Sequence, residues 1–143
     1  MKRLLLTLAL LAATASAPVR AASDDEVAAR KLALEVAGAF SNDGFKLRDG
    51  NWCGKIEPGK PALIQVNLYA GNQYWFTVGA TEAAKKVAIT VFDETGKPVA
   101  TEPYADASVA AAGFAPKASG PYYIRVEVAE GAPAAFCLLY SYR

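Results

Sequence analysis

The sequence predicts a mainly β protein, an antiparallel β-sandwich of the jelly-roll kind with about seven to eight strands and one N-terminal amphipathic helix. The clearest observation is the stretch Tyr122 to Val128, in which apolar residues alternate with Tyr123, Arg125 and Glu127. A period of two, rich in aromatic and β-branched residues, is typical of a half-buried strand. Further segments of this kind follow one another between Gly, Pro and Asp turn signals, and this regular spacing favours a sandwich or barrel.

Residues 1–21 have the features of an export signal. A short basic start is followed by an apolar run over residues 4–13, which is too short to span a bilayer as a helix. Residues 15–17 form one candidate cleavage site, but Pro18 would follow that cut, so we place cleavage after Ala21. An uncleaved anchor is the alternative, although no long apolar run continues the segment. We therefore expect a periplasmic or secreted protein.

The remaining chain is expected to form the helix and a turn over residues 22–44 and one β-sandwich domain over residues 45–143. Loss of three basic residues with the signal leaves 12 Lys and Arg against 14 Asp and Glu, a net charge of −2. No basic patch is interleaved with aromatic residues, so we do not expect nucleic acid as a partner. No second apolar span follows, so we expect no transmembrane segment after signal cleavage.

The chain has two cysteines, Cys53 and Cys137. In an exported chain an even number of cysteines favours a disulfide, and with two cysteines the pairing is fixed. The bridge would tie the start of the domain to the last strand. Closing so long a loop stabilises the fold by about 4–5 kcal/mol in the chain-entropy model. Two free buried thiols are the alternative.

The helix is predicted over residues 24–40. Ser23 and Glu26 form a capping box at its start, and Asn-Asp-Gly at residues 42–44 ends it. Its apolar face consists of Ala29, Leu32, Ala33, Val36 and Phe40. We expect this face to pack on the domain, mainly through Leu32, Val36 and Phe40. A helix that lies on a membrane or binds a partner is the alternative, but the polar side is not enriched in Lys and Arg.

Seven strands are expected, over residues 62–69, 73–79, 87–92, 98–101, 108–114, 122–129 and 135–142. Residues 70–72 are expected to join the first two as a hairpin. Residues 93–96 are expected to join the third and fourth, with Gly96 free to take a positive φ. Before the strands, the segment around Asp49 and Gly50 suggests a short hairpin or an irregular turn, and residues 57–60 suggest a type II turn.

Several catalytic chemistries have no candidate residues in this chain. It contains no histidine, which excludes Ser-His-Asp and Cys-His catalysis and histidine-based zinc sites. No phosphate-binding glycine motif is present. A carboxylate pair for glycoside hydrolysis is a remote alternative, because its candidates lie on turns or strand faces. Those candidates are Asp93, Glu94, Asp106, Glu127 and Glu130. We therefore expect a protein that is not an enzyme.

The sequence predicts no cofactor, with a weak calcium site as the alternative. Asp93, Glu94 and Asp106, together with the hydroxyl of Thr95, offer the hard oxygen ligands that calcium prefers. Their spacing matches no calcium-binding loop.

Aromatic residues on outward strand faces are candidates for stacking on a sugar. If the neighbours of Trp75 face the core, Trp75 faces outward, and Tyr123 and Tyr104 are further outward candidates. Trp52 and Tyr69 belong to the same group. The alternative is that these rings pack in the core or across strands.

Three segments resemble the bacterial pre-peptidase C-terminal domain, and the match covers roughly residues 62–142. They are Gly-Asn-Gln-Tyr-Trp-Phe-Thr-Val within residues 70–78, an apolar strand ending Asp-Glu-Thr-Gly within residues 87–99, and Ala-Pro-Lys-Ala-Ser-Gly-Pro-Tyr-Tyr-Ile-Arg-Val within residues 114–126. The resemblance implies a jelly-roll-like sandwich in secreted or periplasmic proteins, where such domains accompany peptidases and are linked to substrate or surface binding, sometimes with calcium. It carries over no catalytic residue.

The sequence thus predicts a stand-alone, exported, non-catalytic binding module of the bacterial cell envelope. Its ligand is expected to be a carbohydrate or another surface ligand, held by Trp75, Tyr123, Tyr104 and nearby loop residues. The alternative is a structural or assembly protein that binds a protein partner through a strand edge or the N-terminal helix.

Overall fold

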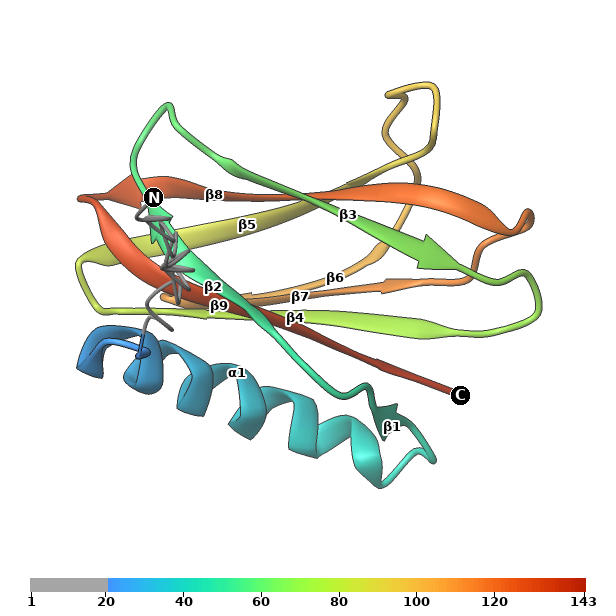
Figure 1. Ribbon diagram of the computed structural model, residues 1–143, viewed down its shortest axis with the longest axis horizontal. Helices are drawn as coiled ribbons and strands as arrows, with labels where there is room; N and C mark the ends of the chain where they lie inside the picture. Colours follow the sequence, from blue (N-terminus) through green and yellow to red (C-terminus); the bar gives the residue numbers. More distant parts are fainter. Residues whose placement is uncertain (1–20) are drawn as a thin grey trace, which may run out of the picture.

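The computed structural model describes residues 21–143 and places one helix against a sandwich of two antiparallel sheets (Figure 1). The prediction of a mainly β fold with one helix is confirmed. The expected export signal lies outside the described residues, apart from Ala21. Within residues 21–143, no helix is long and apolar enough to cross a membrane.

The larger sheet has six strands in the order β1-β9-β4-β7-β6, and β2 pairs with β9 as well. These strands are β1 (Lys46–Leu47), β2 (Trp52–Ile56), β4 (Tyr74–Ala80), β6 (Glu102–Asp106), β7 (Val109–Phe114) and β9 (Ala134–Tyr142). β1 and β2 pair with successive parts of β9 rather than with each other. The segment around Asp49 and Gly50 is therefore a turn along one sheet edge, and the hairpin alternative was wrong.

The smaller sheet has three strands, β3 (Ala62–Leu68), β8 (Gly120–Gly131) and β5 (Ala84–Phe92), with β8 in the middle. The alternation predicted along residues 122–128 is confirmed. Tyr122, Ile124, Val126 and Val128 are buried, and the residues between them are half-buried on the outer face. The core lies between the two sheets, where Phe76 and Leu138 face Ile124 and Val126 with almost no exposed surface.

The hairpin predicted at residues 70–72 was wrong. β3 belongs to the smaller sheet and β4 to the larger one, so this loop crosses from one sheet to the other. Burial alternates along β3, whereas β4 is buried on both faces, with Tyr74, Phe76 and Val78 in the core. In the sequence, however, both strands show alternating large apolar residues. Alternation alone does not reveal whether two such strands pair side by side or face each other, which is why the sequence suggested a hairpin.

The strand predicted over residues 98–101 was also wrong. Only one isolated bridge forms there, between Phe92 and Pro98, because Pro98 has no N–H group to donate to a ladder. The strand forms later instead, as β6, whose residues are all exposed and show no apolar alternation. The turn predicted over residues 93–96 is present, since Gly96 has a φ of 81° and Asp93 N donates a hydrogen bond to Lys97 O.

The helix α1 (Asp24–Ser41) lies on the outer face of the larger sheet (Figure 1). Ser23 caps it, because its Oγ accepts a hydrogen bond of 3.2 Å from Glu26 N. The predicted docking is confirmed, but the buried helix residues are Ala29, Ala33 and Ala37. Leu32, Val36 and Phe40 are only partly buried, at the sides of this contact. The helix therefore packs on the sheet through its smallest side chains.

Gly79 on β4 explains how closely the helix approaches. A Cβ atom at this position would lie 2.3 Å from the carbonyl oxygen of Ala29 and 2.7 Å from the backbone nitrogen of Ala33. Backbone therefore meets backbone at this point, and any side chain at residue 79 would push the helix away from the sheet.

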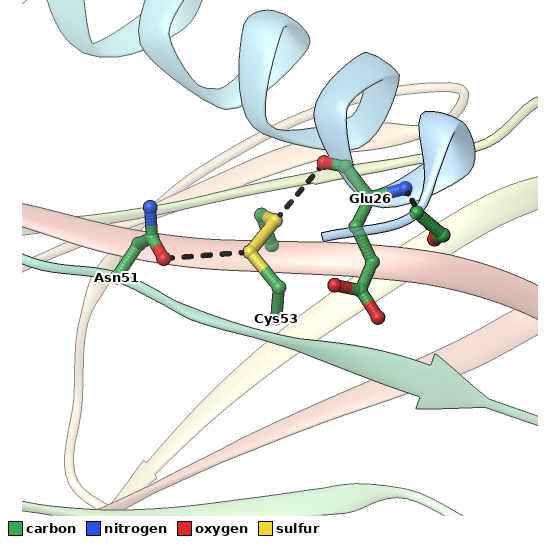
Figure 2. The surroundings of a disulfide bond; sticks show 5 residues. Glu26, Asn51 and Cys53 are labelled. Carbon is green, nitrogen blue, oxygen red and sulfur yellow. Dashed lines mark hydrogen bonds between the residues drawn. A yellow bond between two sulfur atoms is a disulfide. The ribbon is translucent and has the colours of Figure 1, made fainter. Parts of the chain in front are cut away.

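The predicted disulfide between Cys53 and Cys137 is present, and the described residues include no free cysteine. The two cysteines are directly opposite each other on β2 and β9, with their Cα atoms 4.1 Å apart. The first turn of α1 lies against the bridge, with the Glu26 carbonyl oxygen 3.3 Å from Cys137 Sγ (Figure 2). A disulfide sulfur has no hydrogen to donate, so this is a packing contact that brings the helix start and the bridge together.

Candidate functional site

Trp75 faces away from the core as expected, but the end of the helix covers it. Its ring stacks on Phe40, with ring centroids 4.2 Å apart and an interplanar angle of 9°. A Cβ atom at Gly113, on the neighbouring strand, would lie 3.0 Å from the same ring. Trp75 is therefore half-buried between α1 and the sheet, where it helps to hold the helix in place.

The three aromatic residues predicted to bind a ligand do not form one surface. Tyr104 lies on β6, on the same side of the larger sheet as the helix, and is 46% exposed. Tyr123 lies on β8, on the outer face of the smaller sheet, opposite Gln65 on one side and Phe92 on the other. Trp75 and Tyr104 thus face one side of the molecule and Tyr123 faces the other.

The residues considered for calcium are also not brought together. Asp93 Oδ1 accepts hydrogen bonds from Thr95 Oγ1 at 2.6 Å, Thr95 N at 2.9 Å and Lys97 N at 3.0 Å. The Thr95 side-chain bond, followed by the Lys97 backbone bond, lowers the pKa of Asp93 below its ordinary value. Among residues 21–143, no three Asp, Glu or Cys side chains gather as a metal-binding group. Asp93 serves the turn, and Glu94 and Asp106 do not complete a ligand set with it.

A pocket with a volume of about 280 Å³ lies at the end of the sandwich where the chain crosses from β3 to β4. We call it the tyrosine pocket. It is lined by Arg48, Asn67, Tyr69, Asn72, Tyr74, Tyr140 and Tyr142. The end of β3, the start of β4 and the end of β9 all lie at this end of the molecule (Figure 1).

The fold positions these residues from separate segments. Tyr74 and Tyr142 are directly opposite each other on β4 and β9, and Tyr140 lies two residues earlier on the same face of β9. The crossing after β3 brings Tyr69 and Asn72 over the tyrosines from the other sheet. Arg48 follows β1, and its backbone nitrogen donates a hydrogen bond of 3.0 Å to Tyr140 O.

Hydrogen bonds fix the centre of the tyrosine pocket. The Tyr74 hydroxyl oxygen accepts from the backbone nitrogen of Tyr69 at 2.9 Å and from Asn72 Nδ2 at 3.1 Å. Both acceptor positions of this hydroxyl are then used, so its proton is left to donate. Burial raises the pKa of Tyr140 above its ordinary value, although the positive charge of Arg48 opposes this shift. Tyr140 therefore presents a neutral hydroxyl at physiological pH.

The guanidinium of Arg48 lies over two aromatic rings. Its Cζ is 5.1 Å from the centroid of the Trp52 ring and 5.3 Å from that of Tyr140. The two rings are themselves stacked, with centroids 6.0 Å apart and an interplanar angle of 15°. A cation at these distances from ring faces is attracted by the aromatic quadrupole. Trp52 does not line the pocket, but its ring contacts Arg48 and restricts the orientation of this charged side chain.

A larger groove of about 740 Å³ lies between α1, the β4–β5 connection and the start of β9. No aromatic ring lines this groove within the described part of the chain. Its charged lining residues have both signs and are Asp25, Lys31, Glu35, Lys55, Glu57 and Glu82. Volume alone favours the groove, but a small-molecule site needs convergent aromatic and polar groups, and these are found in the tyrosine pocket.

Sequence reasoning identified part of this site. Tyr69 and Trp52 were among the outward aromatic candidates, while Arg48, Asn72 and Tyr140 were missed. The expected hairpin at residues 70–72 would have kept Tyr69 away from the last strand. A signal was nevertheless present, because tyrosines recur at i and i+2 at the end of the last strand and flank the crossing loop.

No protein-family model matches the chain, and no curated protein matches it either. The fold and the chemistry of the tyrosine pocket are therefore the basis for proposing a function.

Proposed function

We propose that the protein is an exported, non-catalytic binding module of the bacterial cell envelope that holds a carbohydrate in the tyrosine pocket. The observation that carries this proposal is the convergence of four tyrosines, two asparagines and one arginine on one concave surface. Tyr69 is 63% exposed and Tyr142 39% exposed, so their rings are accessible to a ligand.

The chemistry of the pocket suits a sugar. A sugar ring has apolar faces, which pack on aromatic rings, and hydroxyl groups, which need donors and acceptors around the rim. Tyrosine supplies both in one side chain, and asparagine amides donate and accept together. The pocket volume lies near the lower end of the range for ligand sites, about 300–1,000 Å³, which favours a short saccharide unit over a long polymer.

The residues that line the tyrosine pocket support binding without catalysis. Glycoside hydrolysis normally needs two carboxyl groups that flank the scissile bond. Within residues 21–143, no Asp or Glu lines the tyrosine pocket. The chain also has no histidine that could act as a general acid or base. We therefore propose that the ligand is held and released unchanged, with neither calcium nor another cofactor required.

Export to the envelope is supported by the disulfide, since such bonds persist in oxidising compartments. The proposed signal over residues 1–21 and cleavage after Ala21 agree with this location. The resemblance to the pre-peptidase C-terminal domain also favours surface binding in the periplasm or outside the cell. Membership of that family remains part of the proposal.

The test is calorimetric titration of the exported protein, with its disulfide intact, against a panel of short envelope-type oligosaccharides. Tyr69→Ala should weaken binding about fivefold to tenfold, because one exposed stacking ring contributes about 1 kcal/mol. Tyr104→Ala is the matched control, since it removes an exposed tyrosine from the helix side of the molecule. Binding that depends on Tyr104, Trp75 or Tyr123 but not on Tyr69 would contradict the proposed site.

A second candidate function is assembly with a protein partner through the helix. Val27 and Leu34 are exposed on α1 at 56% and 37%, and their spacing of seven residues places them on the same side. The edge strand β6 is a weaker candidate, because Pro103 lies within it and discourages pairing. A partner that co-purifies from solubilised envelope and is lost with Leu34→Glu, while sugar binding stays intact, would favour assembly.

A further inference from the structure

We infer that the tyrosine pocket selects a saccharide that carries a carboxylate, and that Arg48 binds this group. The inference rests on the proposed function, because it names the class of sugar that the same pocket would hold. It adds a charge requirement that tyrosines and asparagines alone would not impose.

The first support is the charge of the lining. Arg48 is the one charged residue among those that line the pocket, and no acidic residue of the described chain accompanies it there. The salt bridges found in residues 21–143 join Lys60 to Glu57, Lys86 to Glu130 and Arg125 to Glu127. Arg48 takes part in none of them, so within this part of the chain no carboxylate forms a salt bridge with it.

The second support is the hydrogen-bonding capacity of Arg48. A guanidinium has five N–H donors. In the part of the chain that the structure describes, its side chain makes one hydrogen bond, from Nη1 to the carbonyl oxygen of Asp49 at 3.0 Å. The remaining donors are left for a ligand, and two of them suit the two oxygens of a carboxylate.

The third support is the orientation of the guanidinium. Its Cζ lies 5.1 Å from the centroid of the Trp52 ring and 5.3 Å from that of Tyr140, so contacts with two rings hold the side chain in place. Stacking also restricts the rotamers of a long side chain before the ligand arrives. A pre-oriented guanidinium loses less entropy on binding than a free one, which favours a defined geometry over general attraction of anions.

The neighbouring groups fit the rest of such a ligand. The Tyr74 hydroxyl, with both acceptor positions filled, keeps its proton for donation to a ligand. Asn67, Tyr69 and Tyr142 line the same pocket and bring an amide and two hydroxyl groups to it. The pocket thus combines one cationic site for a carboxylate with several neutral sites for hydroxyl groups, the composition expected for an acidic sugar.

The test compares trigalacturonate with its fully methyl-esterified form by calorimetric titration of the intact exported protein. The two probes share ring structure and hydroxyl groups and differ in charge. We expect the wild-type protein to bind trigalacturonate about tenfold to a hundredfold more tightly, the range for a charge-assisted hydrogen bond. This difference should shrink as sodium chloride is raised, because salt screens an exposed ion pair.

Variants test whether Arg48 causes the difference in affinity between trigalacturonate and its methyl ester. Arg48→Gln should abolish the preference, so that the charged probe and its methyl ester bind with equal affinity, and Arg48→Lys should retain part of the preference. Arg125→Gln is the matched control, since Arg125 also stacks on a ring, with its Cζ 5.1 Å from the Phe92 centroid, but on the outer face of the smaller sheet. It should leave the preference intact.

The outcomes separate the two proposals. Equal binding of trigalacturonate and its methyl ester, both weakened by Tyr69→Ala, overturns the charge requirement and leaves carbohydrate binding standing. Failure of these probes and of neutral oligosaccharides to bind overturns both. A second carboxylated probe, the N-acetylglucosamine–N-acetylmuramic acid disaccharide, distinguishes a cell-wall source from a uronate polymer: tighter binding of either one than of its methyl ester supports the inference.

Discussion

The two outer faces of the sandwich are built from different kinds of residue. On the larger sheet most of the face under α1 is made of small side chains, with Thr77, Gly79, Ala111 and Gly113 around Leu139, and Trp75 stacks on Phe40 at the end of the helix. On the smaller sheet the outer face is made of long ones, with Arg125 over the ring of Phe92 and 3.4 Å from Glu127. Small residues allow another element to approach, whereas long amphipathic residues cover their own sheet. The small side chains on the larger sheet thus let the helix approach closely, whereas the long side chains on the smaller sheet leave no room for it.

The largest effect should come from removing the disulfide beneath the helix. The Cys53→Ala/Cys137→Ala variant should lose about 2–5 kcal/mol of unfolding free energy, because the bridge closes a long loop. Urea unfolding measures this loss. Hydrogen exchange sharpens the comparison, since the first turn of α1 contacts the bridge and should lose protection before β8 does. Equal loss of protection in both regions would show that the bridge supports the whole fold evenly.

Two leucines test the faces directly. Leu139→Ala should cost about 2–5 kcal/mol, because Leu139 is buried with Ala33 and Ala37 between helix and sheet. Leu63→Ala, on the exposed face of the smaller sheet, should change stability by less than about 0.5 kcal/mol. Chemical unfolding of both variants provides the measurement. Similar costs at the two positions would remove the distinction between a covered and an open face.

Alanine substitutions at two glycines should change the stability of the protein in opposite directions. Gly79→Ala should destabilise the protein by about 1–3 kcal/mol, because the new methyl group would meet the backbone of Ala29 and Ala33. Gly38→Ala, within α1 and with no atom near the added Cβ, should stabilise by up to about 1 kcal/mol through helix propensity. Thermal unfolding of each variant tests this pair, and a shift in the same direction for both would contradict the close backbone contact.

The smallest effect concerns the turn after β5 in the smaller sheet. Hydrogen bonds lower the pKa of Asp93 in the folded protein below its ordinary 3.8. The stabilisation from the charged form is therefore complete above the unfolded-state pKa and is lost as the pH falls through the lower folded-state value. Asp93→Asn should reduce stability at neutral pH, and the gap to the wild type should close in acid. A gap independent of pH between 2 and 7 would exclude this linkage.

The alternating strands and the helix could be predicted from the sequence because each is encoded by local periodicity. The segment from Tyr122 to Val128 alternates in the structure as it does in the sequence, and Ser23 caps the helix as its residue type suggests. The disulfide followed from the cysteine count. These features need no knowledge of which strand lies beside which.

The tyrosine pocket could not be predicted, because it depends on strand order. The same alternation in β3 and β4 fits a hairpin and a crossing between sheets equally well, and only the crossing brings Tyr69 to Tyr140. Trp75 was correctly predicted to point away from the core. The sequence could not show that the helix would dock on that side of the sheet and cover the Trp75 ring. β6 was missed because an exposed edge strand carries no apolar pattern.

The position of β9 has a consequence for when the protein can fold. This strand follows all the others in sequence, yet it pairs with β1, β2 and β4 and carries Cys137. The larger sheet therefore cannot close, and the bridge cannot form, until the chain has been made as far as residue 142. Contacts of such long sequence separation also slow folding. A chain built this way can complete its larger sheet and its disulfide only after β9 has been synthesised, whatever has already formed in the smaller sheet.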